Sequence, residues 1–324
     1  EISTLTPSIT DLSVSDELAV QEATDRYLGL VTKFTAISDL VLMTNFPMAK
    51  TEFGGYSSNS KESVGRRILM SNILLEQACN QISGCRVVDL FSFVADVGLK
   101  NWFNHRDWYT ARVPGGAKYG VELTRMFRPF LQRKSGILRK VLAVDFDNTL
   151  WGGVAGEEGV AGIKVGGAYP GNVYEVFQKN VRALKDRGII LVAASKNNLT
   201  DIEPIFNDRP EMILSLEDFS AIKVDWNEKV SNLCDAALEL NIGIDSFVFV
   251  DDNPLEIDKA KAADLGIECI LIPQPSENFD EFYDHLYSCF PLEDITEEDK
   301  VRSEMYTVDK KRLAFRHEFS SMTD

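Results

Sequence analysis

Three apolar stretches of the chain each end in polar residues that suit phosphoryl chemistry. These residues are Asp145, Asp147 and Thr149 after VLAV, Ser195-Lys196-Asn197 after ILVAA, and Asp251-Asp252-Asn253 after FVFV. Carboxylates that gather in one place repel one another and raise one another's pKa unless a cation lies among them. Mg²⁺ meets that need, because it prefers oxygen ligands and commonly bridges to a phosphate. We therefore predict a Mg²⁺-dependent site in which Asp145 attacks phosphorus and Asp147 is the general acid and base.

Strands that alternate with helices from Lys140 onward would bring these motifs together. The expected strands are 141–147, 189–195, 212–215, 246–252 and 267–273, and the expected helices are 171–188, 199–208, 227–243 and 254–266. Such alternation predicts a mostly parallel sheet, and ligands bind outside the carboxyl ends of its strands. Any one of the motifs alone is more typical of a turn after a strand. Three of them in this order favour one shared site.

The rest of the chain is less informative. Residues 22–135 mix a helical stretch at 66–82 with strand candidates at 39–45 and 85–92, which favours an α/β or helical accessory domain. About the first 20 residues are polar and acidic and indicate a linker. The charged segment 295–319 predicts a terminal helix. We therefore expect an accessory domain at 1–137, a catalytic domain at 138–290 and a C-terminal extension at 291–324.

Composition excludes several classes of protein. A net charge of −16 argues against general nucleic-acid binding. No apolar run reaches the roughly 20 residues that span a bilayer, so no membrane segment is expected. The five cysteines lack C-x-x-C spacing and the three histidines are scattered. This argues against a zinc site or a disulfide framework and favours a reducing, cytoplasmic location. The basic segment 125–140 is either a solvated helix end or a docking patch for an acidic partner.

Four stretches resemble one known family. VLAVDFDNTLWGGVAGEEG, AASKNN, DWNEKVSNL and VFVDDNP are similar to the haloacid dehalogenase superfamily, and specifically to its FkbH-like branch. The resemblance covers about residues 138 to 290, and FNHRDWYTARVPGGAKYG before them also resembles such proteins. It implies a Rossmann-like core with a parallel sheet. The segment between Asp145 and Ser195 is long enough for a small flap but not for a cap domain.

The resemblance also implies roles for individual residues. Asp145 would be nucleophile and metal ligand, Asp147 would offer its backbone carbonyl to the metal, and Asp251 would complete the Mg²⁺ site. Lys229 would neutralise the phosphate, with Lys223 as the competing lysine. The phosphate and substrate would be bound by Thr149, Trp151, Gly152, Gly153, Ser195, Lys196 and Asn197. For Trp151-Gly152-Gly153 the alternative is a tight turn with the tryptophan in the core.

Family resemblance implies an unusual reaction. Relatives transfer a glyceryl unit from 1,3-bisphosphoglycerate, with loss of phosphate, to the phosphopantetheine thiol of an acyl carrier protein in polyketide biosynthesis. Many of them have cysteine where this chain has Ala194, so we hypothesise that Ala194 replaces a catalytic cysteine. Two alternatives remain open. One is a Mg²⁺-dependent phosphatase for a small metabolite, and the other is a carrier-protein docking module without catalysis.

Overall fold

The computed structural model describes residues 17–48, 64–111, 115, 119–135 and 139–290. The expected C-terminal helix and most of the expected linker lie outside these residues, although residues 17–20 belong to a helix. The described residues form two compact units, one up to Arg128 and one from Pro129 onward. The predicted boundary after residue 137 lies further along the chain.

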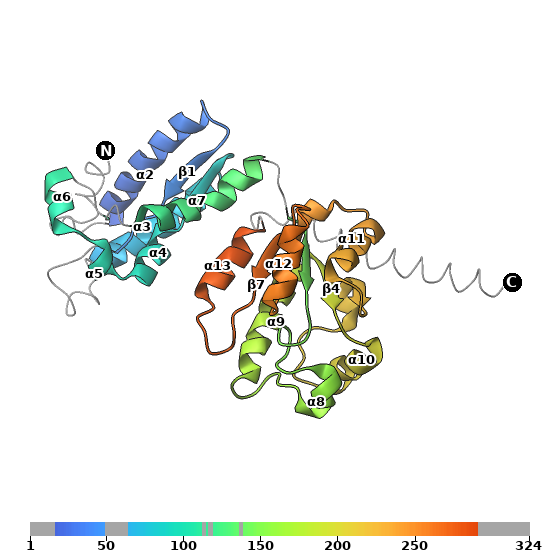
Figure 1. Ribbon diagram of the computed structural model, residues 1–324. Coiled ribbons are helices and arrows are strands. Elements are labelled where there is room, and N and C mark those ends of the chain that lie inside the picture. Colours follow the sequence, from blue (N-terminus) through green and yellow to red (C-terminus); the bar gives the residue numbers. More distant parts are fainter. Residues whose placement is uncertain (1–16, 49–63, 112–114, 116–118, 136–138, 291–324) are drawn as a thin grey trace. The chain divides into compact units, whose positions relative to one another are not determined.

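The first unit is a small α/β structure (Figure 1). Its elements are α2 (Glu17–Thr35), β1 (Val41–Thr44), α3 (Val64–Cys79), β2 (Cys85–Val88), α4 (Leu90–Val97), α5 (Leu99–Trp102) and α6 (His105–Ala111). The helix α7 (Gly120–Ser135) begins in the first unit and continues into the second. β1 and β2 are the two strands expected from the sequence, and they pair in parallel from Val41 opposite Cys85 to Thr44 opposite Val88. Buried apolar side chains of α2, α3 and both strands form one small core.

The second unit contains a five-stranded parallel sheet (Figure 1). Its strands are β3 (Val141–Val144), β4 (Ile190–Ser195), β5 (Phe219–Val224), β6 (Phe247–Asp251) and β7 (Glu268–Leu271), in the order β5-β4-β3-β6-β7. The chain runs outward from β3 through β4 to β5, and then resumes at β6 on the other side of β3. The strand order therefore reverses between β3 and β6, which is where parallel α/β sheets bind ligands.

Helices cover both faces of this sheet because every strand carries apolar residues on both sides. One face packs against α9 (Gly171–Asp186), α10 (Leu199–Asp208) and α13 (Asp280–Ser288). The other face packs against α11 (Lys229–Glu239) and α12 (Pro254–Ala262). This architecture confirms the predicted α/β class with a parallel sheet. Among the helices that the structure describes, none combines the length and apolar character needed to cross a membrane.

One strand prediction was wrong. Residues 212–215 form no strand, because side chains of α9 satisfy their backbone instead. Gln178 Oε1 accepts from the amides of Ile213 and Leu214 at 2.9 and 3.2 Å, and Arg182 donates to the carbonyl of Ile213 at 2.9 Å. The strand that follows β4 in the sheet is β5, which sequence reasoning missed.

The segment between β3 and α9 is short, as expected for a minimal cap. It contains α8 (Ala155–Gly162), which packs on α10, and an isolated antiparallel bridge between Gly152 and Lys164. Among the described residues it adds no separate domain to the carboxyl edge of the sheet.

Candidate active site

Three carboxylates converge at the carboxyl ends of β3 and β6. Asp145 directly follows β3, Asp251 is the last residue of β6, and Asp252 comes next. One carboxylate oxygen of each lies within 4.8 Å of the others. The Asp145 amide donates to the Val250 carbonyl at 3.0 Å, so the strand pairing extends into the site and fixes its backbone. Sequence reasoning had predicted Asp145 and Asp251 as metal ligands but not Asp252.

Among the described residues, one buried ammonium group lies against these carboxylates. Lys229 Nζ, from the first residue of α11, is 2.9 Å from Asp145 Oδ1 and 2.6 Å from Asp251 Oδ2. Burial lowers the pKa of Lys229, but the two carboxylates more than offset this, so its pKa lies above the usual value. The lysine is therefore charged. The competing lysine, Lys223, pairs with Glu239 at 2.7 Å instead.

One lysine does not balance three carboxylates. Burial, together with the charge of Asp145, raises the pKa of Asp251 to about 7, although Lys229 opposes the shift. Burial and Asp145 likewise raise the pKa of Asp252 to about 6. Two neighbouring carboxyls thus hold protons more tightly than ordinary aspartates do. Hard oxygen donors with excess negative charge are the ligand set that Mg²⁺ prefers, so these residues fit a bound Mg²⁺.

Asp147 is held by a different set of contacts. Its Oδ1 accepts from Trp151 Nε1 and from the amide of Ala155, both at 3.0 Å, and its Oδ2 accepts from Asn197 at 3.0 Å. Burial raises the pKa of Asp147 despite these three hydrogen bonds. A carboxyl that is positioned and raised in pKa suits proton transfer. Its carboxylate is not among the three that converge, and the predicted role of its backbone carbonyl stays a prediction.

Hydrogen bonds within the protein fix the backbone of the turn after β3. Asn148 has φ of 52° and its side-chain oxygen accepts from the amide of Gly153 at 2.9 Å. The Gly152 amide donates to the Lys164 carbonyl at 2.9 Å. Both glycine amides are thus hydrogen-bonded within the protein, and their predicted role in binding a ligand stays a prediction. Trp151 is fully buried, 5.3 Å from Phe146 between ring centroids, so the tight-turn alternative describes this segment.

The end of β4 supplies two buried polar side chains. Asn197 Nδ2 donates to Ser195 Oγ at 3.0 Å and also to Asp147, so this amide joins the β4 motif to the β3 motif. Thr149 is also buried, and its hydroxyl has no hydrogen-bond partner among the described residues. Ser195 and Thr149 therefore remain candidates for binding phosphate oxygens.

The two neighbours of Ser195 make different contacts. Lys196 Nζ is 3.1 Å from Glu256 and 3.7 Å from Glu228, so its charge is already matched by carboxylates. Ala194 is fully buried in the apolar cluster between the sheet and helices α11 and α12, where it packs among residues such as Leu233. A thiol at this position would lie among apolar side chains.

Comparison with solved structures relates this architecture to a phosphatase. The chain is similar to the N-terminal part of a Bacteroides fragilis protein, a part that contains a phosphatase domain complexed with Mg. The TM-score is 0.77 and the identity 26%, and the match covers 90% of this chain and 77% of that one. The second unit therefore has the Rossmann-like fold of haloacid dehalogenase phosphatases.

Two further matches are much weaker. One is a haloacid dehalogenase family enzyme from Bacteroides thetaiotaomicron, in complex with magnesium and inorganic phosphate. Its TM-score is 0.30 at 12% identity, over 45% of this chain and 99% of that one. The other is an uncharacterised protein from Corynebacterium glutamicum. Its TM-score is 0.32 at 17% identity, and the match covers 48% of this chain and 97% of that one. Neither supports a functional conclusion. No protein-family model and no curated protein matches the chain.

Proposed function

We propose that the chain is a Mg²⁺-dependent phosphatase that acts through a phosphoryl group on Asp145. The observation that carries this proposal is the convergence of the carboxylates of Asp145, Asp251 and Asp252 where the strand order reverses, with the first two buried and in contact with Lys229. The similar Bacteroides fragilis structure, which contains a phosphatase domain complexed with Mg, supports the same class of reaction.

Asp145, Asp251 and Asp252 would hold the Mg²⁺. When bound, the ion would neutralise their charge and polarise a phosphate oxygen. Lys229 orients Asp145 and Asp251, because it contacts both within 3 Å. Such a preset arrangement avoids reorganisation of the site during the reaction.

The reaction then has two balanced steps. A carboxylate oxygen of Asp145 forms a bond to phosphorus as the phosphorus–oxygen bond to the leaving group breaks, and Asp147 donates a proton to that leaving oxygen. Asp147 next takes a proton from water, which attacks the phosphorus and releases inorganic phosphate from Asp145. The raised pKa of Asp147 supports both roles.

The test is phosphate release from a panel of small phosphorylated metabolites and an aryl phosphate, with Mg²⁺ or with a chelator. We expect Mg²⁺-dependent release that Asp145→Asn abolishes and that the surface control Lys223→Met leaves unchanged. Asp147→Asn should lower turnover by roughly 10²- to 10⁴-fold, the usual contribution of general acid–base catalysis. Release that persists in Asp145→Asn, or in chelator, would contradict the proposal.

We further propose glyceryl transfer as a second candidate, as the FkbH-like resemblance implies. The observation in its favour is the small insertion between Asp145 and Ser195, which contributes only α8 and one bridge among the described residues. An open edge would admit the phosphopantetheine arm of an acyl carrier protein. Because Ala194 offers no thiol, that thiol would attack the acyl carbonyl of 1,3-bisphosphoglycerate directly, form the thioester and release the acyl phosphate as inorganic phosphate. Hydrolysis of the remaining phosphate ester at the phosphatase site would then leave the glyceryl thioester.

Intact-mass measurement separates the two candidates. The chain is incubated with Mg²⁺, 1,3-bisphosphoglycerate and a phosphopantetheinylated carrier protein. A carrier that gains the mass of a glyceryl unit supports transfer. Phosphate release with an unmodified carrier supports the phosphatase and rejects transfer. An unmodified carrier without phosphate release would argue against both and leave the docking module.

A further inference from the structure

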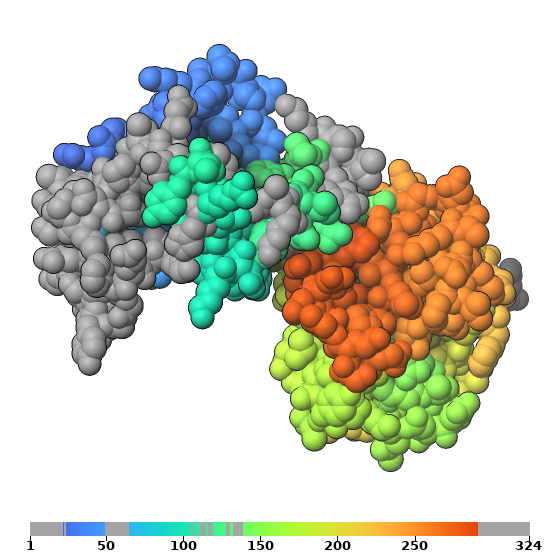
Figure 2. Space-filling model, turned by 60° about the vertical axis from the view of Figure 1, so that its left-hand side comes forward, coloured from blue at the N-terminus to red at the C-terminus, as the bar shows by residue number. Residues whose placement is uncertain are grey.

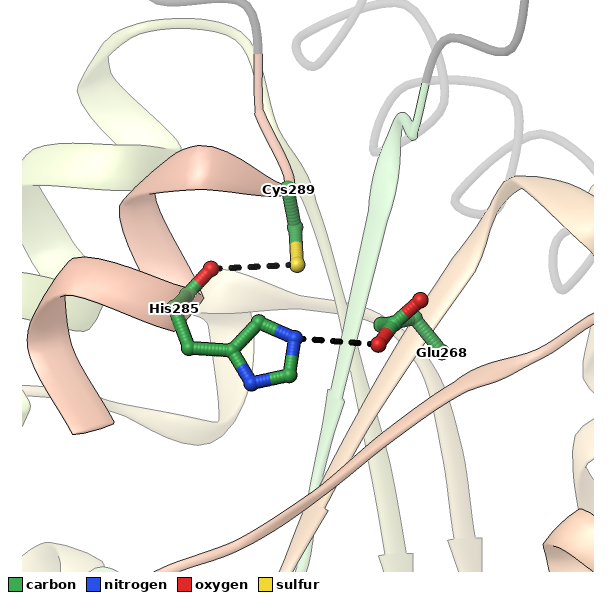
Figure 3. A group of neighbouring side chains, drawn as sticks. All are labelled: Glu268, His285 and Cys289. Carbon is green, nitrogen blue, oxygen red and sulfur yellow. Dashed lines mark hydrogen bonds and ion pairs between the residues drawn. The ribbon is translucent and has the colours of Figure 1, made fainter. Parts of the chain in front are cut away.

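A second cluster of metal-binding side chains lies on β7 and at the end of α13 (Figure 3). His285 is in α13, and Cys289 caps that helix four residues later, so both side chains face the same way. Glu268 is the first residue of the edge strand β7. Its Oε1 is 3.0 Å from His285 Nε2, and the sulfur of Cys289 completes a group whose ligand atoms all lie within 4.8 Å of one another.

This cluster is separate from the carboxylate site. Asp251 pairs with Leu271, the last residue of β7, whereas Glu268 lies at the opposite, amino end of the same strand. The three residues are partly exposed, with 37% of the His285 side chain and 28% of the Glu268 side chain accessible. Residues after β6, coloured orange, form a large part of one surface of the second unit (Figure 2). An ion can therefore reach the cluster without passing through the candidate active site.

We propose that Glu268, His285 and Cys289 bind Zn²⁺. An imidazole, a thiolate and a carboxylate form a mixed nitrogen, sulfur and oxygen set that suits this borderline-soft ion and not Mg²⁺. Tetrahedral Zn²⁺ with bonds of about 2.0 Å to nitrogen and oxygen holds those two atoms about 3.3 Å apart. The observed 3.0 Å between Glu268 and His285 is close to that value. The sulfur of Cys289 lies within 4.8 Å of both atoms and donates to the carbonyl of His285 at 3.2 Å, so it would leave this contact and turn inward to close the site.

Arg139 orients the carboxylate ligand. Its guanidinium lies 3.6 Å from Glu268 Oε2 and leaves Oε1 to face His285. Arg139 is itself fixed, because it donates hydrogen bonds to the backbone carbonyls of Asp245 and Gly266. Outer contacts that fix a ligand in this way are a common feature of protein metal sites.

The proposed site has three protein ligands and leaves a fourth position for water or another donor. Bound Zn²⁺ would tie β7, which has a neighbour on one side only, to the end of α13. The two elements otherwise meet through the His285–Glu268 contact and apolar packing. The ion would therefore stabilise this edge of the sheet against heat.

Cobalt substitution tests the proposal directly. The whole chain is titrated with Co²⁺ in excess Mg²⁺, which occupies the carboxylate site. Only a thiolate ligand gives the intense sulfur-to-cobalt charge-transfer band in the near ultraviolet. We expect one equivalent of Co²⁺ to produce this band, Zn²⁺ to displace it, and Zn²⁺ to raise the melting temperature.

Variants decide which thiol is responsible. Cys289→Ser should abolish the band, and the matched control Cys234→Ser, a partly buried cysteine on α11, should retain it. His285→Gln should weaken Zn²⁺ binding by at least about tenfold, the scale of losing a supporting group at a metal site. Circular dichroism reports whether each variant is folded. A wild-type protein without the band, or a band that survives in Cys289→Ser, would overturn the proposal.

Discussion

Replacing Lys229 with methionine removes the only ammonium group that contacts the carboxylates of the candidate site among the described residues. At an effective dielectric constant of about 20, charges 2.9 and 2.6 Å apart attract by roughly 6 kcal/mol each. Desolvation of the buried ammonium offsets much of this gain. Loss of one partner from a buried ion pair costs about 3–5 kcal/mol, because the remaining charges stay buried without compensation. We therefore expect Lys229→Met to lose about that much unfolding free energy at pH 8.

The assay is thermal unfolding at pH 8 in chelator, with Lys223→Met as the matched control. Lys223 pairs with Glu239 near the surface, so its loss should cost less than about 1 kcal/mol. Lys229→Met should melt roughly 6–20 °C below the wild type, since a domain of this size shifts by about 2–4 °C per kcal/mol. Mg²⁺ should also stabilise Lys229→Met more than it stabilises the wild type. Equal melting temperatures for the two variants would refute the reasoning.

Four further predictions concern the second unit. The pKa of Asp251 near 7 means that its carboxyl takes up a proton as the pH falls, so Mg²⁺ affinity measured by calorimetry should drop about tenfold from pH 8 to pH 6. Because the folded protein binds this proton more tightly than the unfolded chain does, the metal-free fold should become more stable as the pH falls through 7. A free energy of unfolding that does not change with pH in this range would contradict the proton uptake. Gln178→Leu should lower the free energy of unfolding, measured with denaturant, by about 3 kcal/mol, because the carbonyl of Leu150 and two backbone amides lose their hydrogen-bond partner. The surface variant Lys179→Met is the control, and an equal loss in both variants would contradict this prediction. In Ala194→Cys the new thiol should react with a thiol reagent only after unfolding, because position 194 is fully buried. If the native variant has one more fast-reacting thiol than the wild type, position 194 is accessible and this prediction is wrong.

Much of the second unit could be predicted from the sequence because its central strands are buried on both faces. VLAV and ILVAA are continuous apolar runs, and their residues are almost fully inaccessible. Such runs stand out in a sequence, and polar residues directly after them must lie at the carboxyl edge. Asp145, Ser195 and Asp251 were located in this way.

The edge strand β5 shows where this reasoning fails. Its sequence, FSAIKV, mixes polar with apolar residues, and its last three residues are only partly buried. Because it pairs with β4 on one side only, it needs no continuous apolar run. MILS, just before it, has the apolar pattern of a strand, but Gln178 and Arg182 occupy its backbone groups. The side chains of Gln178 and Arg182 in α9 thus bind the backbone of MILS, and β5 pairs with β4 in its place.

The sequence argued against a zinc site for a related reason, although the structure brings Glu268, His285 and Cys289 together. His285 and Cys289 are four residues apart at the end of a helix, and two such residues alone do not indicate a metal site. Glu268 comes from β7, and only the packing of α13 against that strand brings it within reach. The three residues can therefore be recognised as a group in the folded structure but not in the sequence.

The choice of carboxylates follows from where each strand ends. In an extended strand Asp145 and Asp147 would point to the same side, whereas Asp251 and Asp252 would point to opposite sides. The backbone pairing between β3 and β6 stops after Asp145, and the chain then turns, with φ of 52° at Asn148. The Asp147 carboxylate therefore accepts hydrogen bonds from Trp151 and Ala155. β6 likewise ends at Asp251, so the next residue is free to turn its carboxyl toward the same cluster. Strand periodicity therefore fails at the residues of the candidate site, because that site begins where the regular backbone stops.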